Sequence, residues 1–131
     1  MLFKFRRREI PWEVVDSKSV EPVPMYYEDE DLDIVSVGQA DTCGTYVFDV
    51  KHLTRGNELS NSVLFARQQL LARISKHGFN LLLLESWRLT VLRRGKHYRV
   101  EVRYRGRPAR ALGKLPARRP PPFMAVLQGG P

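Results

Sequence analysis

The apolar residues of this chain recur with two different periods, which predict one helix and several strands. From Thr45 to Val50 every second residue is apolar and points to one side, as in a half-buried strand. A helix is predicted from Glu58 to His77, because its apolar residues step by four and three and therefore share one face. These residues are Leu59, Val63, Ala66, Leu70 and Ile74. Gly78 follows as a residue suited to end the helix in the left-handed conformation.

A β-hairpin is predicted after the helix. The stretches Trp87–Arg93 and Lys96–Arg105 both alternate, and we expect Arg94-Gly95 between them to form a two-residue turn. That turn sets Trp87 opposite Val102 and collects the apolar side chains on one face. The preceding apolar run, Phe79–Glu85, is typical of a buried strand.

The two ends of the chain predict less regular structure. Residues 1–44 contain three prolines and an acidic run from Tyr26 to Asp33, so we expect an acidic, largely flexible arm before a domain that spans 45–127. Within that domain we expect a turn at Arg105–Pro108, a short strand over 109–112, and a proline-rich extended segment, 114–127. The first interpretation is that this segment docks on its own domain through Phe123, and the alternative is that it is a ligand for an aromatic-lined groove of another protein. The expected fold class is α+β: one amphipathic helix packed on an antiparallel sheet of three to five strands.

Charge is distributed very unevenly along the sequence. Residues 9–49 carry a net charge of −10, whereas residues 50–131 carry +14, and the whole chain carries +8. An acidic segment joined to a basic body suggests an anionic partner for the body and a self-contact that competes for the same surface.

The polar face of the hairpin is the candidate binding surface, because its arginines suit bidentate contacts with carboxylate or phosphate. The residues expected to receive the anion are Arg88, Arg99, Arg103, Arg105, Arg94 and Lys96. The first interpretation is a non-enzymatic interaction module whose partner is an acidic protein or its own N-terminal arm. The alternative is non-specific binding of nucleic acid by the same face. A solvated face with no specific partner is also open.

Arg67 is the one charged residue expected near the middle of the helix's apolar face. The first interpretation is a snorkelling side chain whose stem packs while its head reaches water or an acid such as Glu85. The second is a residue that lines a pocket.

The sequence predicts no catalytic residues, metal or cofactor. Asp49, Glu85 and Glu101 come in an order like that of metal-dependent nucleases, but arginine stands where such enzymes need a lysine, so a nuclease is a distant third interpretation. The single cysteine, Cys43, excludes an internal disulfide, and we expect it in a polar loop among acids, where thiolate formation is disfavoured.

No apolar stretch is long enough to span a bilayer, and one cysteine fits an intracellular setting, cytoplasmic or nuclear. From Phe48 to Leu127 the chain resembles a group of short, uncharacterised fungal proteins. The segments that carry this resemblance are His-Leu-Thr-Arg-Gly-Asn, Ser-Asn-Ser-Val-Leu-Phe-Ala-Arg, Glu-Ser-Trp-Arg-Leu-Thr and Arg-Pro-Pro-Pro-Phe. The resemblance implies a folded unit after a variable tail, and it implies no activity.

Overall fold

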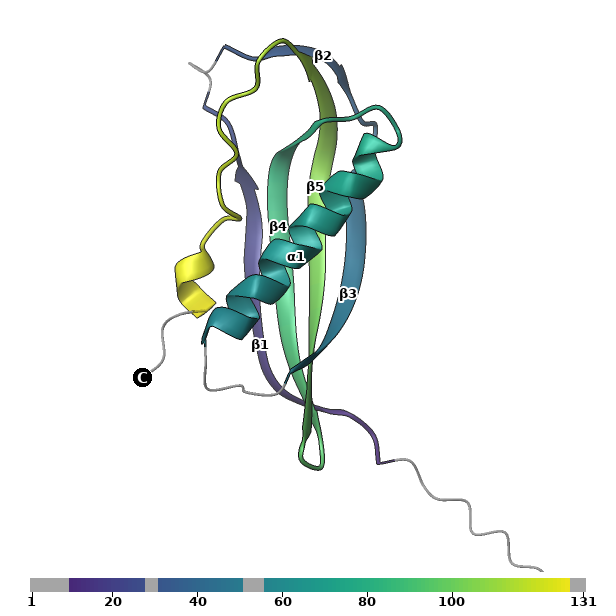
Figure 1. The fold of residues 1–131 in the computed structure, drawn as a ribbon, viewed down its shortest axis with the longest axis vertical. Coiled ribbons are helices and arrows are strands. Elements are labelled where there is room, and N and C mark those ends of the chain that lie inside the picture. Colours follow the sequence, from purple (N-terminus) through teal and green to yellow (C-terminus); the bar gives the residue numbers. More distant parts are fainter. Residues whose placement is uncertain (1–9, 28–30, 51–55, 128–131) are drawn as a thin grey trace, which may run out of the picture.

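A single helix lies against one antiparallel sheet, which confirms the predicted α+β class (Figure 1). The structure, a computed structural model, describes residues 10–27, 31–50 and 56–127. Its elements, in chain order, are β1 (Glu13–Pro24), β2 (Asp33–Val37), β3 (Thr42–Val50), α1 (Gly56–Ser75), β4 (Leu81–Arg94), β5 (His97–Leu112) and a short 3₁₀ helix, η1 (Met124–Leu127).

The long strands β4 and β5 form the centre of the sheet. β1 pairs with the outer edge of β4, and β3 and β2 share the outer edge of β5, with β3 along residues 98–106 and β2 along residues 109–112. All pairs are antiparallel. Because β2 and β3 share one edge of β5, the sheet is four strands wide, although five strands contribute to it.

The predicted boundary between a flexible arm and a folded domain at residue 44 is wrong for the part of the arm that the structure describes. Glu13–Pro24 and Asp33–Val37 are strands of the sheet, and β3 begins at Thr42. Prolines and charges are tolerated in these strands because β1 and β2 lie at edges, where one side of the backbone needs no partner. Residues 1–9 lie outside the described residues.

Helix α1 buries the face that its spacing predicts. Val63, Ala66 and Leu70 are fully buried against the sheet and Ile74 nearly so, and each large aliphatic side chain buried this way contributes about 1.5–3 kcal/mol. The helix ends two residues earlier than predicted, at Ser75, but Gly78 terminates it as expected. Gly78 has a φ of 85°, and the amide of Phe79 donates to the carbonyl of Ile74 at 3.1 Å, as in a Schellman motif.

The hairpin has the predicted faces but not the predicted register. Arg94 pairs with His97, so the turn is Gly95-Lys96, and Trp87 lies opposite Tyr104 rather than Val102. A shift of two residues keeps every side chain on its predicted face. β5 also runs without a turn through 105–108, where the expected break is replaced by a register shift in β4 between Leu82 and Glu85.

The C-terminal segment, residues 114–127, packs on the same side of the sheet as α1, along β1 (Figure 1). The indole Nε1 of Trp87 donates to the carbonyl of Pro122 at 2.9 Å, and Lys18 Nζ donates to the carbonyl of Val126 at 2.9 Å. Leu127 is buried. The expectation that this segment docks on its own domain is correct, but Phe123 is not its anchor, because that side chain is 63% exposed.

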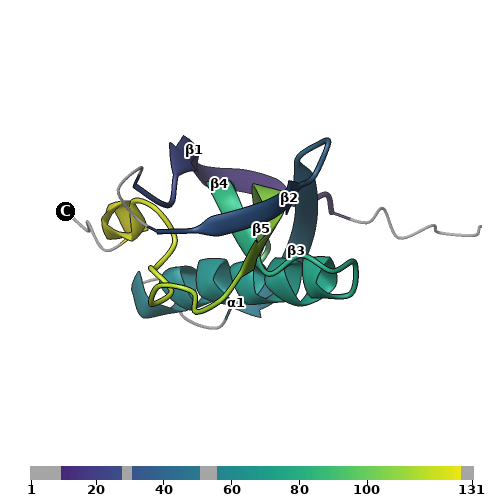
Figure 2. The ribbon, with the colours of Figure 1, turned by 90° about the horizontal axis from the view of Figure 1, so that it is seen from above.

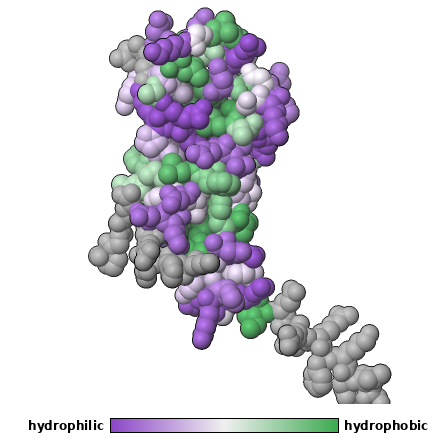
Figure 3. Space-filling view, viewed as in Figure 1, coloured by the Kyte–Doolittle hydropathy of each residue, from purple (hydrophilic) through white to green (hydrophobic). Residues whose placement is uncertain are grey.

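The two sides of the sheet therefore differ. α1 runs along one side (Figure 2), and the space-filling view of that side shows apolar surface in separate patches between hydrophilic side chains (Figure 3). The opposite side of the sheet, alongside the hairpin, is polar and largely exposed, and we call it the open face. Leu81, Ala109 and Ala111 form a second small core, against which Leu115 packs.

Candidate anion-binding site

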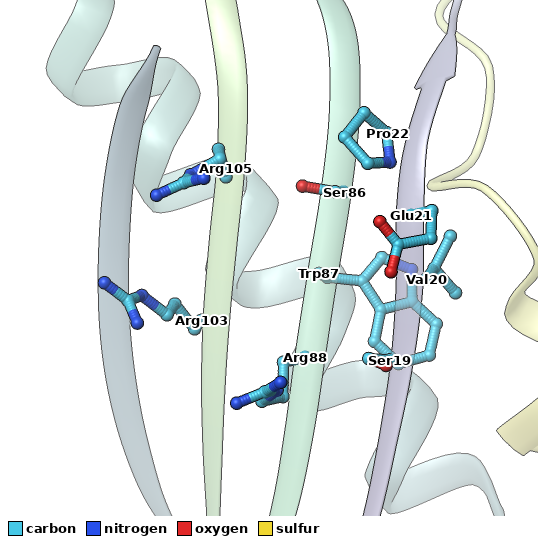
Figure 4. Close-up of a pocket in the computed structure, with 9 residues that line it drawn as sticks. All are labelled: Ser19, Val20, Glu21, Pro22, Ser86, Trp87, Arg88, Arg103 and Arg105. Carbon is cyan, nitrogen blue, oxygen red and sulfur yellow. The ribbon is translucent and has the colours of Figure 1, made fainter.

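Three of the predicted arginines line a shallow cleft on the open face. Arg88 extends from β4, and Arg103 and Arg105 extend from β5 towards β3 (Figure 4). The cleft has a volume of about 280 Å³. Its lining residues are Ser19, Val20, Glu21, Pro22, Ser86, Trp87, Arg88, Arg103 and Arg105. We call this the arginine cleft.

The pairing of β3 with β5 shows why these arginines differ from their neighbours. At the two ends of the shared ladder, an arginine of β5 is matched by an acid. Arg99 Nε lies 3.3 Å from Asp49 Oδ1, and Arg107 Nε lies 2.7 Å from Asp41 Oδ1. Between these two pairs, β3 places no acid opposite an arginine of β5.

At those middle positions, β3 supplies uncharged side chains. Thr45 lies opposite Arg103, and Cys43 lies opposite Arg105. Arg103 Nε donates to Cys43 Sγ at 3.3 Å, and this hydrogen bond is the main reason why the pKa of Arg103 is raised above its ordinary value. The expectation that Cys43 sits in a loop among acids is wrong, because it is a β3 residue beside an arginine.

The other neighbour of Arg103 makes the charge imbalance larger. Arg88 of β4 pairs directly with Arg103 across the hairpin. Like charges in directly opposed positions of a sheet destabilise it. Among the described residues, none of the three arginines of the cleft is in an ion pair.

The remaining predicted residues lie at the tip of the hairpin. Arg94, Lys96 and Arg99 line a second hollow together with Trp12. The guanidinium carbons of Arg94 and Arg99 lie 4.6 and 4.3 Å from the centroid of the Trp12 ring, which is cation–π distance. Trp12 was not expected at this site, because it lies in the segment predicted to be a flexible arm.

Arg67 belongs to a different, buried site on the helix side of the sheet. Its Nε and Nη2 donate to the two carboxylate oxygens of Glu85 at 2.6 and 2.9 Å, and Nη1 donates to the carbonyl of Arg119 at 2.5 Å. The Tyr104 hydroxyl also donates to Glu85. Burial first, and then the Glu85 carboxylate, raise the pKa of Tyr104. Glu85 is the acid that was expected to pair with Arg67, but the guanidinium group of Arg67 is buried rather than at the surface.

The residues of the nuclease interpretation do not come together. Glu85 lies on the helix side, whereas Asp49 and Glu101 lie on the open face. Within the described ranges, no group of three or more histidine, cysteine or acidic residues could hold a metal ion.

Comparisons of the chain with models of protein families, with curated proteins and with solved structures give no match. The resemblance to fungal proteins therefore stays a prediction. None of the helices in the described part of the chain has both the length and the apolar character needed to cross a membrane.

Proposed function

We propose that this protein is a binding module, and that its open face receives an acidic segment of another protein at the arginine cleft. The observation that carries the proposal is that Arg88, Arg103 and Arg105 line one cleft without an ion pair among the described residues, whereas Arg93, Arg99 and Arg107 of the same hairpin are each paired with an acid. Two of the three are directly opposed like charges, and an anionic ligand would remove the repulsion between them.

The described N-terminal strands are poor candidates for that ligand. Glu13–Pro24 and Asp33–Val37 hydrogen-bond within the plane of the sheet, so they do not lie across its face. The one acid that they contribute to the lining of the arginine cleft is Glu21. An external acidic segment is therefore the partner we propose. The single cysteine favours an intracellular location for this encounter.

Non-specific binding of nucleic acid is the alternative for the same face. Single strands bind best where bases stack on free aromatic rings beside cations. Trp12 is already in contact with two arginines, and Glu21, Glu101 and Asp49 interrupt the basic surface. These features favour a short acidic segment over a continuous phosphate backbone.

The proposal is tested by the fluorescence anisotropy of labelled poly-glutamate and of a single-stranded oligothymidylate over a range of salt concentrations. R103A is compared with R110A, which removes the same charge from an exposed position of the same strand outside the cleft. We expect R103A to weaken the binding of poly-glutamate about tenfold and R110A to leave it unchanged. Equal effects of the two variants contradict the proposal. Tighter binding of the oligothymidylate, with a steep salt dependence, favours the alternative.

A reciprocal variant adds the missing acid instead of removing the base. T45D places a carboxylate opposite Arg103, at an exposed position, as Asp49 lies opposite Arg99 in the same ladder. We expect it to fold normally and to weaken the binding of poly-glutamate about as much as R103A does. T45N is the uncharged control. Wild-type affinity in T45D would mean that the ligand does not use Arg103.

A further inference from the structure

We infer that the group received by the arginine cleft is a phosphoryl group, carried on a phosphoserine or phosphothreonine of the partner segment. This inference rests on the proposed function and names its ligand more closely. It is carried by the charge, the donors and the size of the cleft.

Charge is the first argument. The lining residues include three guanidinium groups and one carboxylate, that of Glu21, so the cleft carries a net charge of +2. A phosphorylated side chain carries about −1.5 to −2 near neutral pH, because its second pKa is about 6. One carboxylate would leave about half of the cleft's charge without a counterpart.

The hydrogen-bond donors of the cleft also favour a phosphoryl group. Each guanidinium offers a planar fork of N–H donors, and the hydroxyls of Ser19 and Ser86 line the same cleft. A carboxylate presents two oxygens, whereas a phosphoryl group presents three terminal oxygens in a tetrahedral arrangement and can accept from several arginines at once. Clusters of arginine are a recurring means of recognising phosphorylated segments.

The size of the cleft suits a phosphorylated side chain better than a larger ligand. At about 280 Å³ it is smaller than most small-molecule pockets, and it is bounded on one side by β1, where the register shifts between Val20 and Val23. Such irregularities re-aim side chains beside binding sites. Here the shifted stretch contains Glu21, whose carboxylate closes the cleft opposite the arginines (Figure 4).

The experiment compares three short peptides that differ at one position within a glycine and alanine sequence: phosphoserine, glutamate and serine. Binding to the full chain is measured by anisotropy at constant ionic strength and pH 7.5. We expect the phosphoserine peptide to bind at least tenfold more tightly than the glutamate peptide, and the serine peptide not to bind. R103A should abolish the preference and R110A should keep it. E21Q should strengthen the binding of the phosphoserine peptide, because it removes the one lining carboxylate.

The pH dependence separates a phosphoryl group from a carboxylate. Lowering the pH from 7.5 to 5 converts most phosphoserine to its monoanion, so its affinity should fall by up to about tenfold. A glutamate side chain, with an ordinary pKa near 4.3, stays mostly ionised over this range. Of the charged groups that line the cleft, the arginines do not titrate there, and E21Q serves as the control for Glu21.

The outcomes distinguish this inference from the proposed function. If the glutamate and phosphoserine peptides bind equally, the phosphoryl group is wrong and the acidic-segment proposal stands. If the preference for phosphoserine survives the combined R88A/R103A/R105A change, the cleft is not its site and the inference is overturned. If neither peptide nor poly-glutamate binds, both proposals fail.

Discussion

The buried ion pair between Arg67 and Glu85 makes a prediction whose size follows from its geometry. R67M keeps a side chain of similar length on α1 but removes all three hydrogen bonds that the guanidinium donates. The Glu85 side chain is only 1% exposed, so water cannot replace the lost donors. Its carboxylate would keep the Tyr104 hydroxyl as a neutral partner.

Breaking a buried pair by removing one partner costs about 3–5 kcal/mol, because an uncompensated charge stays buried. The carbonyl of Arg119 loses a donor as well, but it belongs to a partly exposed residue and adds little. Domains of this kind have total stabilities of about 5–15 kcal/mol. R67M should therefore remove about a fifth or more of the free energy of unfolding.

Urea unfolding followed by tryptophan fluorescence measures this loss. R67M should lower the midpoint by about 1 M or more without changing the slope. R67M/E85Q removes both charges and keeps an acceptor for Tyr104, so it should be at least 2 kcal/mol more stable than R67M, by the order of magnitude of a buried charge. R73M, at an exposed arginine of the same helix that donates to Thr42 Oγ1 and to the carbonyl of Cys43, is the control and should cost about 1 kcal/mol or less. A loss below about 1 kcal/mol in R67M, or no recovery in the double variant, would refute the reasoning.

Three further predictions follow from single contacts. Y104F should cost about 1.5–3 kcal/mol at neutral pH, because it removes a hydrogen bond to an ionised carboxylate. The pKa of Tyr104 is raised above 10 in the folded protein, so the stability that it contributes is fully present below about pH 10 and is lost above it. Urea unfolding near pH 9 and pH 11 measures this: between these two values the free energy of unfolding should fall less in Y104F than in the wild type, by up to about 1.4 kcal/mol per pH unit. W87F should cost about 1 kcal/mol in thermal unfolding, because it removes the donor to Pro122. G106A should lower the melting temperature, because a Cβ there would lie 2.8 Å from a backbone carbonyl of β4; an unchanged value would contradict this.

The hairpin shows which kind of information the sequence carries reliably. Alternation of apolar and polar residues placed Arg88 and Arg103 on the open face correctly, because parity survives any even shift of register. The register itself depends on which residue occupies the first turn position. Gly95 has a φ of 63°, and the favoured two-residue turns need a positive φ at that first position. The turn is therefore Gly95-Lys96, which moves the pairing by two residues.

The N-terminal strands were harder to predict for a physical reason. Every residue of β2 is exposed, and β1 buries little beyond Val20, so neither strand shows the apolar alternation that reveals a half-buried strand. Pairing with β4 and β5 stabilises them, and that contact is distant in the sequence. The cation–π contacts of Trp12 could not be predicted for the same reason.

The strand pairing shows where the uneven charge of the chain is neutralised. Three ion pairs join acids of the N-terminal segment to arginines of the hairpin: Glu13 to Arg93, Asp41 to Arg107, and Asp49 to Arg99. The acidic and basic halves thus neutralise each other partly within one sheet, in fixed register, rather than through a detachable arm. What is left over is local: β3 places Asp49 opposite Arg99 but the uncharged residues Thr45 and Cys43 opposite Arg103 and Arg105. Arginines that line one cleft without an acidic partner, beside neighbours that have one, are better explained by a ligand than by a generally basic surface. This is why adding one carboxylate at Thr45 tests the proposal more sharply than changing the net charge elsewhere.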